Sequence, residues 1–338
     1  MNGVWALIAA VIAFGITAIM GKWMIPFLHK INFGQTIRDE GPKWHKKKQG
    51  TPTMGGIMFI IGILIATVVA VPCYWQISSD NVFQMSETGL MATKIFAGLC
   101  LALGYGLIGY LDDYIKVVRK RNLGLTVKQK LILQFLVAAA YLAAIYLSGG
   151  TGTTEIPFVG LVDLGWAYWL IAAVLIVGVV NAVNFTDGID GLATGVTMPV
   201  MLFFTAVACF WGQLELGIFS AGLFGGLCGF LIYNFHPAKV FMGDTGSLFL
   251  GGAVCGLAFA LDIPLVLILV GIIYILETLS DILQVGYFKL THGKRIFRMA
   301  PLHHHLELGG WSEVKLFCVF SGVTLLACVL AFLGVMGR

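Results

Sequence analysis

The stretch GYGLIGYLDDYIKVVRKR, residues 105–122, leads from an uncharged run through two adjacent acids, Asp112 and Asp113, into a basic cluster. The uncharged run extends upstream, because residues 95–111 carry no acidic or basic side chain. About 20 such residues cross the hydrocarbon core of a membrane as a helix. The stretch therefore predicts a transmembrane helix that ends at a polar surface, where two carboxylates meet several cations.

The whole chain repeats this pattern. Its 338 residues are 59% hydrophobic and only 11% charged, and their mean hydropathy is +0.92, which excludes a soluble globular protein with a polar surface. We expect an all-α polytopic integral membrane protein with about ten transmembrane helices in a single domain, residues 1–338. The uncharged runs are 1–21, 49–79, 95–111, 164–186, 191–214, 216–235, 245–261 and 316–337, with two shorter or interrupted spans at about 131–148 and 263–288.

Basic residues are concentrated in alternate loops. Loops 29–53, 112–130, 236–244 and 289–311 hold 17 of the 21 Lys and Arg residues. Because short loops rich in Lys and Arg stay in the cytoplasm, we expect these loops inside and both termini outside. The first helix lacks a basic start and is too long for a cleaved signal, so we expect it to remain in the protein.

Two minor features complete the predicted architecture. The segment TEIPFVGLVDLG, residues 154–165, combines β-branched residues with turn formers and predicts a small external β-hairpin. The seven cysteines lie in or beside apolar runs, and none forms a CxxC pair. We interpret them as packing residues, not as a disulfide framework or a zinc site.

Four separated polar clusters fall on the predicted cytoplasmic side. A charged group near hydrocarbon costs about 2.5 to 3.5 kcal/mol on insertion scales, so such residues normally have a partner or a function. Five carboxylates gathered at one level would repel one another unless a divalent cation bound them, and oxygen ligands without nearby thiols favour Mg²⁺ or Mn²⁺. The clusters are Asp112 and Asp113 in LDDY, Asp187 and Asp190 in TDGID, Asp244 in MGDTGS, and His303, His304 and His305 in PLHHHLE.

Simpler interpretations of these residues remain open. Asp112 and Asp113 could be solvated acids at a helix end, although a helix C-terminus prefers cations. Asp187, Asp190 and Asp244 could cap the helices that follow them. Neighbouring residues on a helix point about 100° apart, so we expect the two adjacent acids to have different roles. For the three histidines, phosphate binding or proton transfer is favoured over metal chelation.

The motifs together carry a family resemblance. In order along the chain, KKKQGTPTMGG, LDDYIKV, NFTDGIDGLATG, NFHPAKVFMGDTGS and PLHHHLE resemble the bacterial phospho-N-acetylmuramoyl-pentapeptide transferase family. This family belongs to the polyprenyl-phosphate sugar-1-phosphate transferase superfamily. The resemblance implies a Mg²⁺-dependent enzyme, with Mn²⁺ as a possible substitute, that moves phospho-MurNAc-pentapeptide from its UDP carrier to undecaprenyl phosphate. It further implies lipid I and UMP as products, a site on the cytoplasmic face of the bacterial plasma membrane, and a homodimer.

The resemblance also implies roles for individual residues. Asp244 is the expected metal ligand, Asp113 a second metal or substrate contact, and Asp112 the base that acts on the lipid phosphate, with His303 also catalytic. Gly188, Asn234, Phe241, Gln284 and Ala300 match the nucleoside and nearby inhibitor-binding surface. The expected substrate-binding residues are Lys48, Thr53, Lys128, Asn184, Asp187, Gly188, Asp190, Asn234, Phe241, Gln284, Ala300, His304 and His305.

The span at 263–288 is longer than the membrane needs and turns polar at Glu277 and Asp281. We expect a break or strong tilt there, which would open a groove toward lipid. The alternative functions are a sister transferase that uses UDP-N-acetylglucosamine, an ion-coupled transporter, and a scaffold protein. Transporter acids usually lie near the membrane midplane, whereas these lie at helix ends. No nucleic-acid partner is expected.

Overall fold

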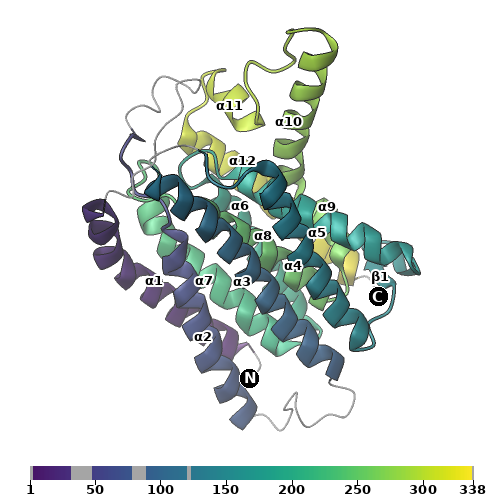
Figure 1. The fold of residues 1–338 in the computed structure, drawn as a ribbon. Helices are drawn as coiled ribbons and strands as arrows, with labels where there is room; N and C mark the ends of the chain where they lie inside the picture. The colour runs from purple at the N-terminus through teal and green to yellow at the C-terminus, as the bar shows by residue number, and fades with distance from the viewer. Residues whose placement is uncertain (1–2, 32–47, 78–88, 120–122, 337–338) are drawn as a thin grey trace.

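Long apolar helices make up most of the computed structural model, which describes residues 3–31, 48–77, 89–119 and 123–336. Figure 1 shows most of them packed side by side in one bundle. The longer helices are α1 (Val4–Lys30), α2 (Gly56–Ile77), α3 (Gly89–Val118), α4 (Val127–Leu147), α5 (Ala167–Thr186), α6 (Leu192–Phe210), α7 (Leu214–Asn234), α8 (Gly243–Ala260), α10 (Ile272–Leu290) and α12 (Glu313–Met336). Shorter elements are α9 (Leu267–Val270), α11 (Leu302–Glu307) and the 3₁₀ helix η2 (Pro264–Val266).

The prediction of about ten transmembrane helices is confirmed. Within the described residues, nine helices are long and apolar enough to cross a membrane. A tenth candidate span is the pair Pro264–Val270 and Ile272–Leu290, which are bent by 79° relative to each other. The predicted break therefore exists, but it falls at Gly271, upstream of Glu277 and Asp281. Glycine is a poor helix former, and it separates the two helical pieces here.

Helix α8 occupies the centre of the bundle, with 89% of its apolar window buried, against 28% for α1, α4 and α12. Its sequence, GDTGSLFLGGAVCGLAFA, is rich in Gly and Ala, which allow membrane helices to approach closely. At the polar end of the α3–α8 contact, a Cβ on Gly109 would collide with the backbone carbonyl of Asp244. This close approach brings the acidic end of α3 against the start of α8.

The predicted hairpin is also confirmed. Strands β1 (Thr153–Ile156) and β2 (Gly160–Asp163) pair antiparallel, with Thr153 opposite Asp163 and Ile156 opposite Gly160. The N–H of Phe158 donates to the carbonyl of Gly334 at 3.1 Å, which ties the hairpin to the end of α12. Figure 1 places the hairpin and both chain ends at the end of the bundle opposite α11. The two termini therefore share one side, as the even number of spans requires.

Several sequence predictions fall on parts of the chain outside the described residues. These are residues 32–47 of the first basic loop, residues 78 and 79 at the end of the uncharged run 49–79, and Lys120 and Arg121. All seven cysteines are described, and all are free. Cys255 and Cys328 are buried, as packing residues should be, whereas Cys100 and Cys318 are exposed.

Candidate active site

Three carboxylates meet where the polar end of α3 contacts the start of α8. Acceptor oxygens of Asp112, Asp113 and Asp244 lie within 4.8 Å of one another. Asp112 and Asp113 are each only 3% exposed. Residues that are 132 positions apart in sequence are thus brought together, as expected from the predicted common membrane face.

The two adjacent acids of α3 have different surroundings. Oδ1 of Asp112 accepts a hydrogen bond from the N–H of Leu125 at 2.8 Å, and its Oδ2 lies 2.6 Å from Nζ of Lys116. The Asp113 carboxylate instead faces α8, where it accepts from the N–H of Thr245 at 2.9 Å and the Thr245 hydroxyl at 2.7 Å. The contacts of the two neighbours therefore differ, while the difference expected between their roles stays a prediction. Asp113 caps a helix, whereas Asp112 anchors the connection between α3 and α4.

Asp244 is held from three sides. Its Oδ2 lies 3.1 Å from Nζ of Lys116 and 2.8 Å from Nζ of Lys130, and its Oδ1 accepts from the Asn184 side chain at 3.0 Å. Asn184 also donates to the hydroxyl of Ser247, one turn along α8, at 2.8 Å. The predicted substrate residue Asn184 therefore positions the carboxylate proposed to bind metal.

Lys116 and Lys130 were not among the predicted site residues. Lys116 lies one helical turn after Asp112, and this i,i+4 spacing was the sequence signal that could have identified it. Lys130 lies two residues after the predicted Lys128, which the structure places in an exposed position in the first turn of α4. A direct substrate contact by Lys128 stays a prediction.

The donor set at this centre suits a hard divalent cation. Three carboxylates converge with no thiol among them, and carboxylate oxygens are the ligands that Mg²⁺ prefers. Asp187, just beyond the end of α5, faces the same centre. Burial, together with the charges of Asp244, Asp113 and Asp190, raises the pKa of Asp187 well above its usual range. Such crowding of negative charge is what a bound cation would relieve.

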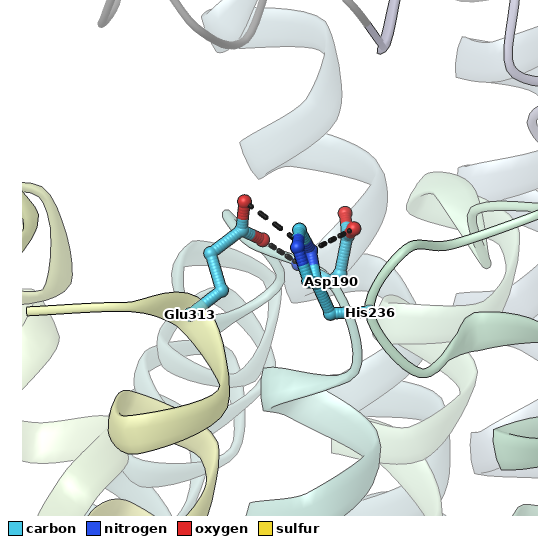
Figure 2. A group of neighbouring side chains, drawn as sticks. All are labelled: Asp190, His236 and Glu313. Carbon is cyan, nitrogen blue, oxygen red and sulfur yellow. Dashed lines mark hydrogen bonds and ion pairs between the residues drawn. The ribbon is translucent and has the colours of Figure 1, made fainter.

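A second charged cluster surrounds the predicted substrate residue Lys48. Nζ of Lys48 lies 2.7 Å from Oδ1 of Asp190 and 2.7 Å from Oε2 of Glu313. Figure 2 shows Asp190, His236 and Glu313 converging from three different segments. Nδ1 of His236 lies 2.9 Å from the other Asp190 oxygen and 3.6 Å from Oε1 of Glu313. His236 and Glu313 were missed at the sequence level, because neither lies in an acidic or basic run.

His303 forms a buried dyad with Glu277. Its Nδ1 lies 2.9 Å from Oε2 of Glu277, and its main-chain N–H donates to the same carboxylate at 3.2 Å. This contact favours a proton on Nδ1 and leaves Nε2 as an acceptor. Nε2 is buried without a hydrogen-bond partner among the described residues. It lies against Gly188, where an added Cβ would collide with the imidazole ring.

The other two histidines make local contacts. Nδ1 of His304 lies 2.8 Å from the carboxylate of Glu307. Nδ1 of His305 accepts from the N–H of Arg298 at 3.1 Å. Each histidine of the triplet therefore has a different partner, and none of the three belongs to the metal-type clusters found within the described chain. The preference for phosphate binding or proton transfer over chelation stays a prediction.

The remaining predicted residues lie in two regions: Gln284 and Ala300 near α11, and Asn234, Phe241 and Thr53 near the start of α8. Gln284 binds the chain before α11, since its side chain donates to the Phe297 carbonyl at 2.9 Å and accepts from the Phe297 N–H at 3.0 Å. Ala300 follows in the same segment. Asn234 is buried, where its amide accepts from the Thr194 hydroxyl at 2.9 Å and donates to the Val240 carbonyl at 3.0 Å.

Phe241 and Thr53 lie on two segments that pair directly. The N–H of Phe241 donates to the Pro52 carbonyl at 2.8 Å, and the Phe241 carbonyl accepts from the N–H of Gly55 at 2.8 Å. The Thr53 hydroxyl lies against Gly243, next to Asp113. These contacts bring the segment before α2 to the start of α8. Contacts of Asn234, Phe241, Gln284 and Ala300 with a nucleoside stay predictions.

Comparison with known proteins assigns the family. Residues 95–262 match the family described as Glycosyl transferase family 4, and residues 48–60 match the phospho-N-acetylmuramoyl-pentapeptide-transferase signature 1. The chain is 46% identical over 325 residues to the phospho-N-acetylmuramoyl-pentapeptide-transferase of Bacillus subtilis, covering 96% of both chains. It is 46% identical over 330 residues to the Clostridium acetobutylicum enzyme, covering 96% of this chain and 97% of the relative. This multipass membrane protein therefore belongs to the phospho-N-acetylmuramoyl-pentapeptide transferase family.

Proposed function

We propose that this protein transfers phospho-MurNAc-pentapeptide from UDP-MurNAc-pentapeptide to undecaprenyl phosphate, forming lipid I and UMP. The observation that carries the proposal is the convergence of Asp112, Asp113 and Asp244 with Lys116 and Lys130 at the ends of membrane helices. The reaction joins a membrane-anchored phosphate to a soluble pyrophosphate, so its site must lie at an interface. A polyanionic donor also requires cations beside any catalytic carboxylate.

The carboxylates Asp244 and Asp113 are the residues that would hold Mg²⁺, with Mn²⁺ as an alternative. When bound, the cation supplies positive charge to the pyrophosphate oxygens and to the departing UMP. Lys116 and Lys130 both lie beside Oδ2 of Asp244, at 3.1 and 2.8 Å, and provide further positive charge for phosphate oxygens. Asn184 keeps the Asp244 side chain in place through its second bond to Ser247.

Asp112 is the proposed base. An oxygen of undecaprenyl phosphate attacks the phosphorus attached to the sugar, the bond from that phosphorus to the UMP oxygen breaks, and UMP leaves with the bonding electrons. Any proton on the attacking phosphate passes to Asp112. The N–H of Leu125 holds Oδ1 of Asp112 at 2.8 Å, and the Lys116 ammonium lies beside Oδ2. These two contacts fix the orientation of the carboxylate. The product is a new pyrophosphate bond between lipid and sugar.

We place the site on the cytoplasmic face of the plasma membrane and propose a homodimer. The distribution of Lys and Arg supports the sidedness, since 17 of 21 fall in alternate loops of the sequence, among them those that hold Lys48, Lys130 and His303. The homodimer and a role in cell shape and division rest on the family resemblance alone. The step would belong to peptidoglycan synthesis.

Release of UMP tests the proposal. Purified protein in detergent would be given UDP-MurNAc-pentapeptide, with and without undecaprenyl phosphate and with Mg²⁺ or EDTA. We expect release only when both lipid phosphate and Mg²⁺ are present, and little release when UDP-N-acetylglucosamine replaces the donor. Asp244→Asn should abolish turnover, whereas Asp262→Asn, at the opposite end of the bundle, should retain it. Equal turnover of both donors, or normal Mg²⁺-dependent activity of Asp244→Asn, would contradict the proposal.

A further inference from the structure

Glu313, the first residue of α12, joins two of the residues expected to bind substrate, Lys48 and Asp190. Its Oε2 lies 2.7 Å from Nζ of Lys48 and accepts a hydrogen bond from the N–H of Asp190 at 3.0 Å. One carboxylate oxygen thus holds both the Lys48 side chain and the backbone of the connection between α5 and α6. Figure 2 shows the Glu313 carboxylate turned toward Asp190 and His236.

The two acids that contact Lys48 are both buried. Asp190 is 2% exposed and Glu313 is 7% exposed. Two buried carboxylates side by side would repel each other without a cation between them, and Lys48 supplies that cation at 2.7 Å from each. Because the Lys48 ammonium already lies between the two acids, the cluster is satisfied as an ion-pair network and needs no metal ion.

The position of Glu313 at the start of α12 favours its negative charge. The residue lies in the first turn of α12, where the helix dipole favours a negative charge. Asp190 is fixed in turn, since its Oδ2 accepts from the N–H of Ala238 at 3.0 Å and lies 2.9 Å from His236. Glu313 therefore connects the start of α12 to three segments: the one before α2, the α5–α6 connection and the α7–α8 connection.

We infer that Glu313 is a positioning residue for the transferase reaction, acting through Lys48 and Asp190. This inference rests on the proposed function and on the family resemblance, which implies that Lys48 and Asp190 bind substrate; we take that substrate to be the UDP-linked donor. The Glu313 carboxylate sets where the Lys48 ammonium lies and where the TDGID connection runs. A misplacement of about 1 Å in a positioned group can cost roughly 100-fold in rate, so a residue that never touches substrate can control donor use.

Donor kinetics of Glu313→Gln provide the test. The amide keeps the shape of the side chain and an acceptor oxygen, but it loses the charge that pairs with Lys48. We expect kcat/KM for UDP-MurNAc-pentapeptide to fall roughly 10- to 100-fold, while KM for undecaprenyl phosphate changes little. Glu313→Asp, which retains the charge on a shorter side chain, should recover part of the loss.

Glu215→Gln is the matched control. Glu215 is also a buried acid in the first turn of a helix, α7, but its partner is the indole N–H of Trp75 at 3.0 Å. A general loss of fold stability would affect both Glu→Gln variants alike, whereas a positioning role predicts a donor-specific defect only for Glu313. Thermal unfolding of each variant in detergent checks that the proteins compared are folded.

A double-mutant cycle with Lys48→Met separates positioning from a structural role. If Glu313 acts through Lys48, the two losses in donor kcat/KM should be far from additive, because the second substitution removes a contact already lost. Additive losses, or a defect confined to the lipid acceptor, would overturn the inference. If Glu313→Gln does not fold, Glu313→Asp enters the same cycle. Absence of UMP release by the unsubstituted protein would instead overturn the proposed function, so the two failures are distinguishable.

Discussion

The carboxylate of Asp113 caps the N-terminus of α8 through Thr245, whose N–H and hydroxyl donate to its Oδ2 at 2.9 and 2.7 Å. The N–H of Asp244 also donates to Asp113 at 3.2 Å. A negative charge at a helix N-terminus is stabilised by the helix dipole and by otherwise unpaired N–H groups. Asp113 therefore caps a helix, which its neighbour Asp112 does not.

Substitution of Asp113 should lower stability as well as activity. Loss of a capping side chain typically costs about 0.5 to 2 kcal/mol, so Asp113→Ala should lower the Tm of the metal-free protein. Asp113→Asn keeps an acceptor for Thr245 and should lower the Tm less. Thermal unfolding in detergent with EDTA measures both. A Tm for Asp113→Ala equal to that of the unsubstituted protein would show that the cap contributes nothing.

Asp112→Asn should instead affect the chemical step. A general base contributes roughly 100- to 10,000-fold in rate, so turnover should fall within that range while donor and Mg²⁺ binding are retained. Because the second pKa of a phosphate monoester is about 6, raising the pH should supply the lipid phosphate as its dianion and partly restore the rate. The measurements are the reaction rate as a function of pH and the donor affinity by calorimetry, each made for Asp112→Asn and for Asp113→Asn. Identical pH profiles with equal loss of binding would show that the acids act as one unit.

The sequence was sufficient to predict the fold class, the number of spans and the gathering of acids at one membrane face. These depend on hydropathy and on the alternation of loops, which are local properties of the chain. The break expected in the span 263–288 is also present, at Gly271, although the sequence alone did not identify the residue at which it falls. Glu277 is buried, and its carboxylate is paired with His303. This polar residue is therefore accommodated inside the protein without a break in the helix.

The partners of the site residues could not be predicted from the sequence. Lys130 pairs with Asp244 across 114 positions, and Glu313 pairs with Lys48 across 265. No local spacing predicts such contacts, since they depend on how helices pack. Lys128 and Lys130 are indistinguishable by composition, and only the rotation of α4 places Lys130 toward the carboxylates.

Lys116→Met should strengthen metal binding while it weakens catalysis. The Lys116 ammonium lies within 3.9 Å of oxygens on all three clustered acids, where it competes with a divalent cation. Its removal leaves a more negative site, so Mn²⁺ should bind several-fold more tightly, and turnover should fall because a phosphate partner is lost. Lys128→Met, at an exposed position nearby, should leave Mn²⁺ affinity unchanged. Calorimetry with Mn²⁺ in the absence of donor measures the affinity; weaker binding to Lys116→Met would contradict this view of the site.

Gly188→Ala should disable the site through His303. An added Cβ would collide with the His303 imidazole, which is buried and held by Glu277, so the ring cannot move aside without losing that bond. Turnover should fall at least as far as in His303→Ala, while Mn²⁺ binding at the carboxylates persists. Gly178→Ala, where a Cβ meets no atom within 4 Å, is the control and should remain active. Normal turnover of Gly188→Ala would show that the ring position is unimportant.

Asp187→Asn should stabilise the metal-free protein, and more so at higher pH. Burial and the nearby Asp244, Asp113 and Asp190 raise the pKa of Asp187 well above its ordinary value of about 3.9. A carboxyl with a raised folded-state pKa costs no stability below its unfolded pKa, and the cost grows as pH rises toward the folded value. The amide never ionises, so the Tm of Asp187→Asn minus that of the unsubstituted protein should widen from pH 5 to pH 8 in EDTA.

Added Mg²⁺ should narrow that difference in Tm, because a cation at the carboxylates offsets the repulsion that raises the Asp187 pKa. Asp163→Asn, on the exposed hairpin at the other end of the bundle, controls for the general effect of removing an acid and should show no widening. A constant Tm difference across the pH range would mean that the Asp187 carboxylate ionises freely. The crowding of negative charge that supports a cation site here would then be absent.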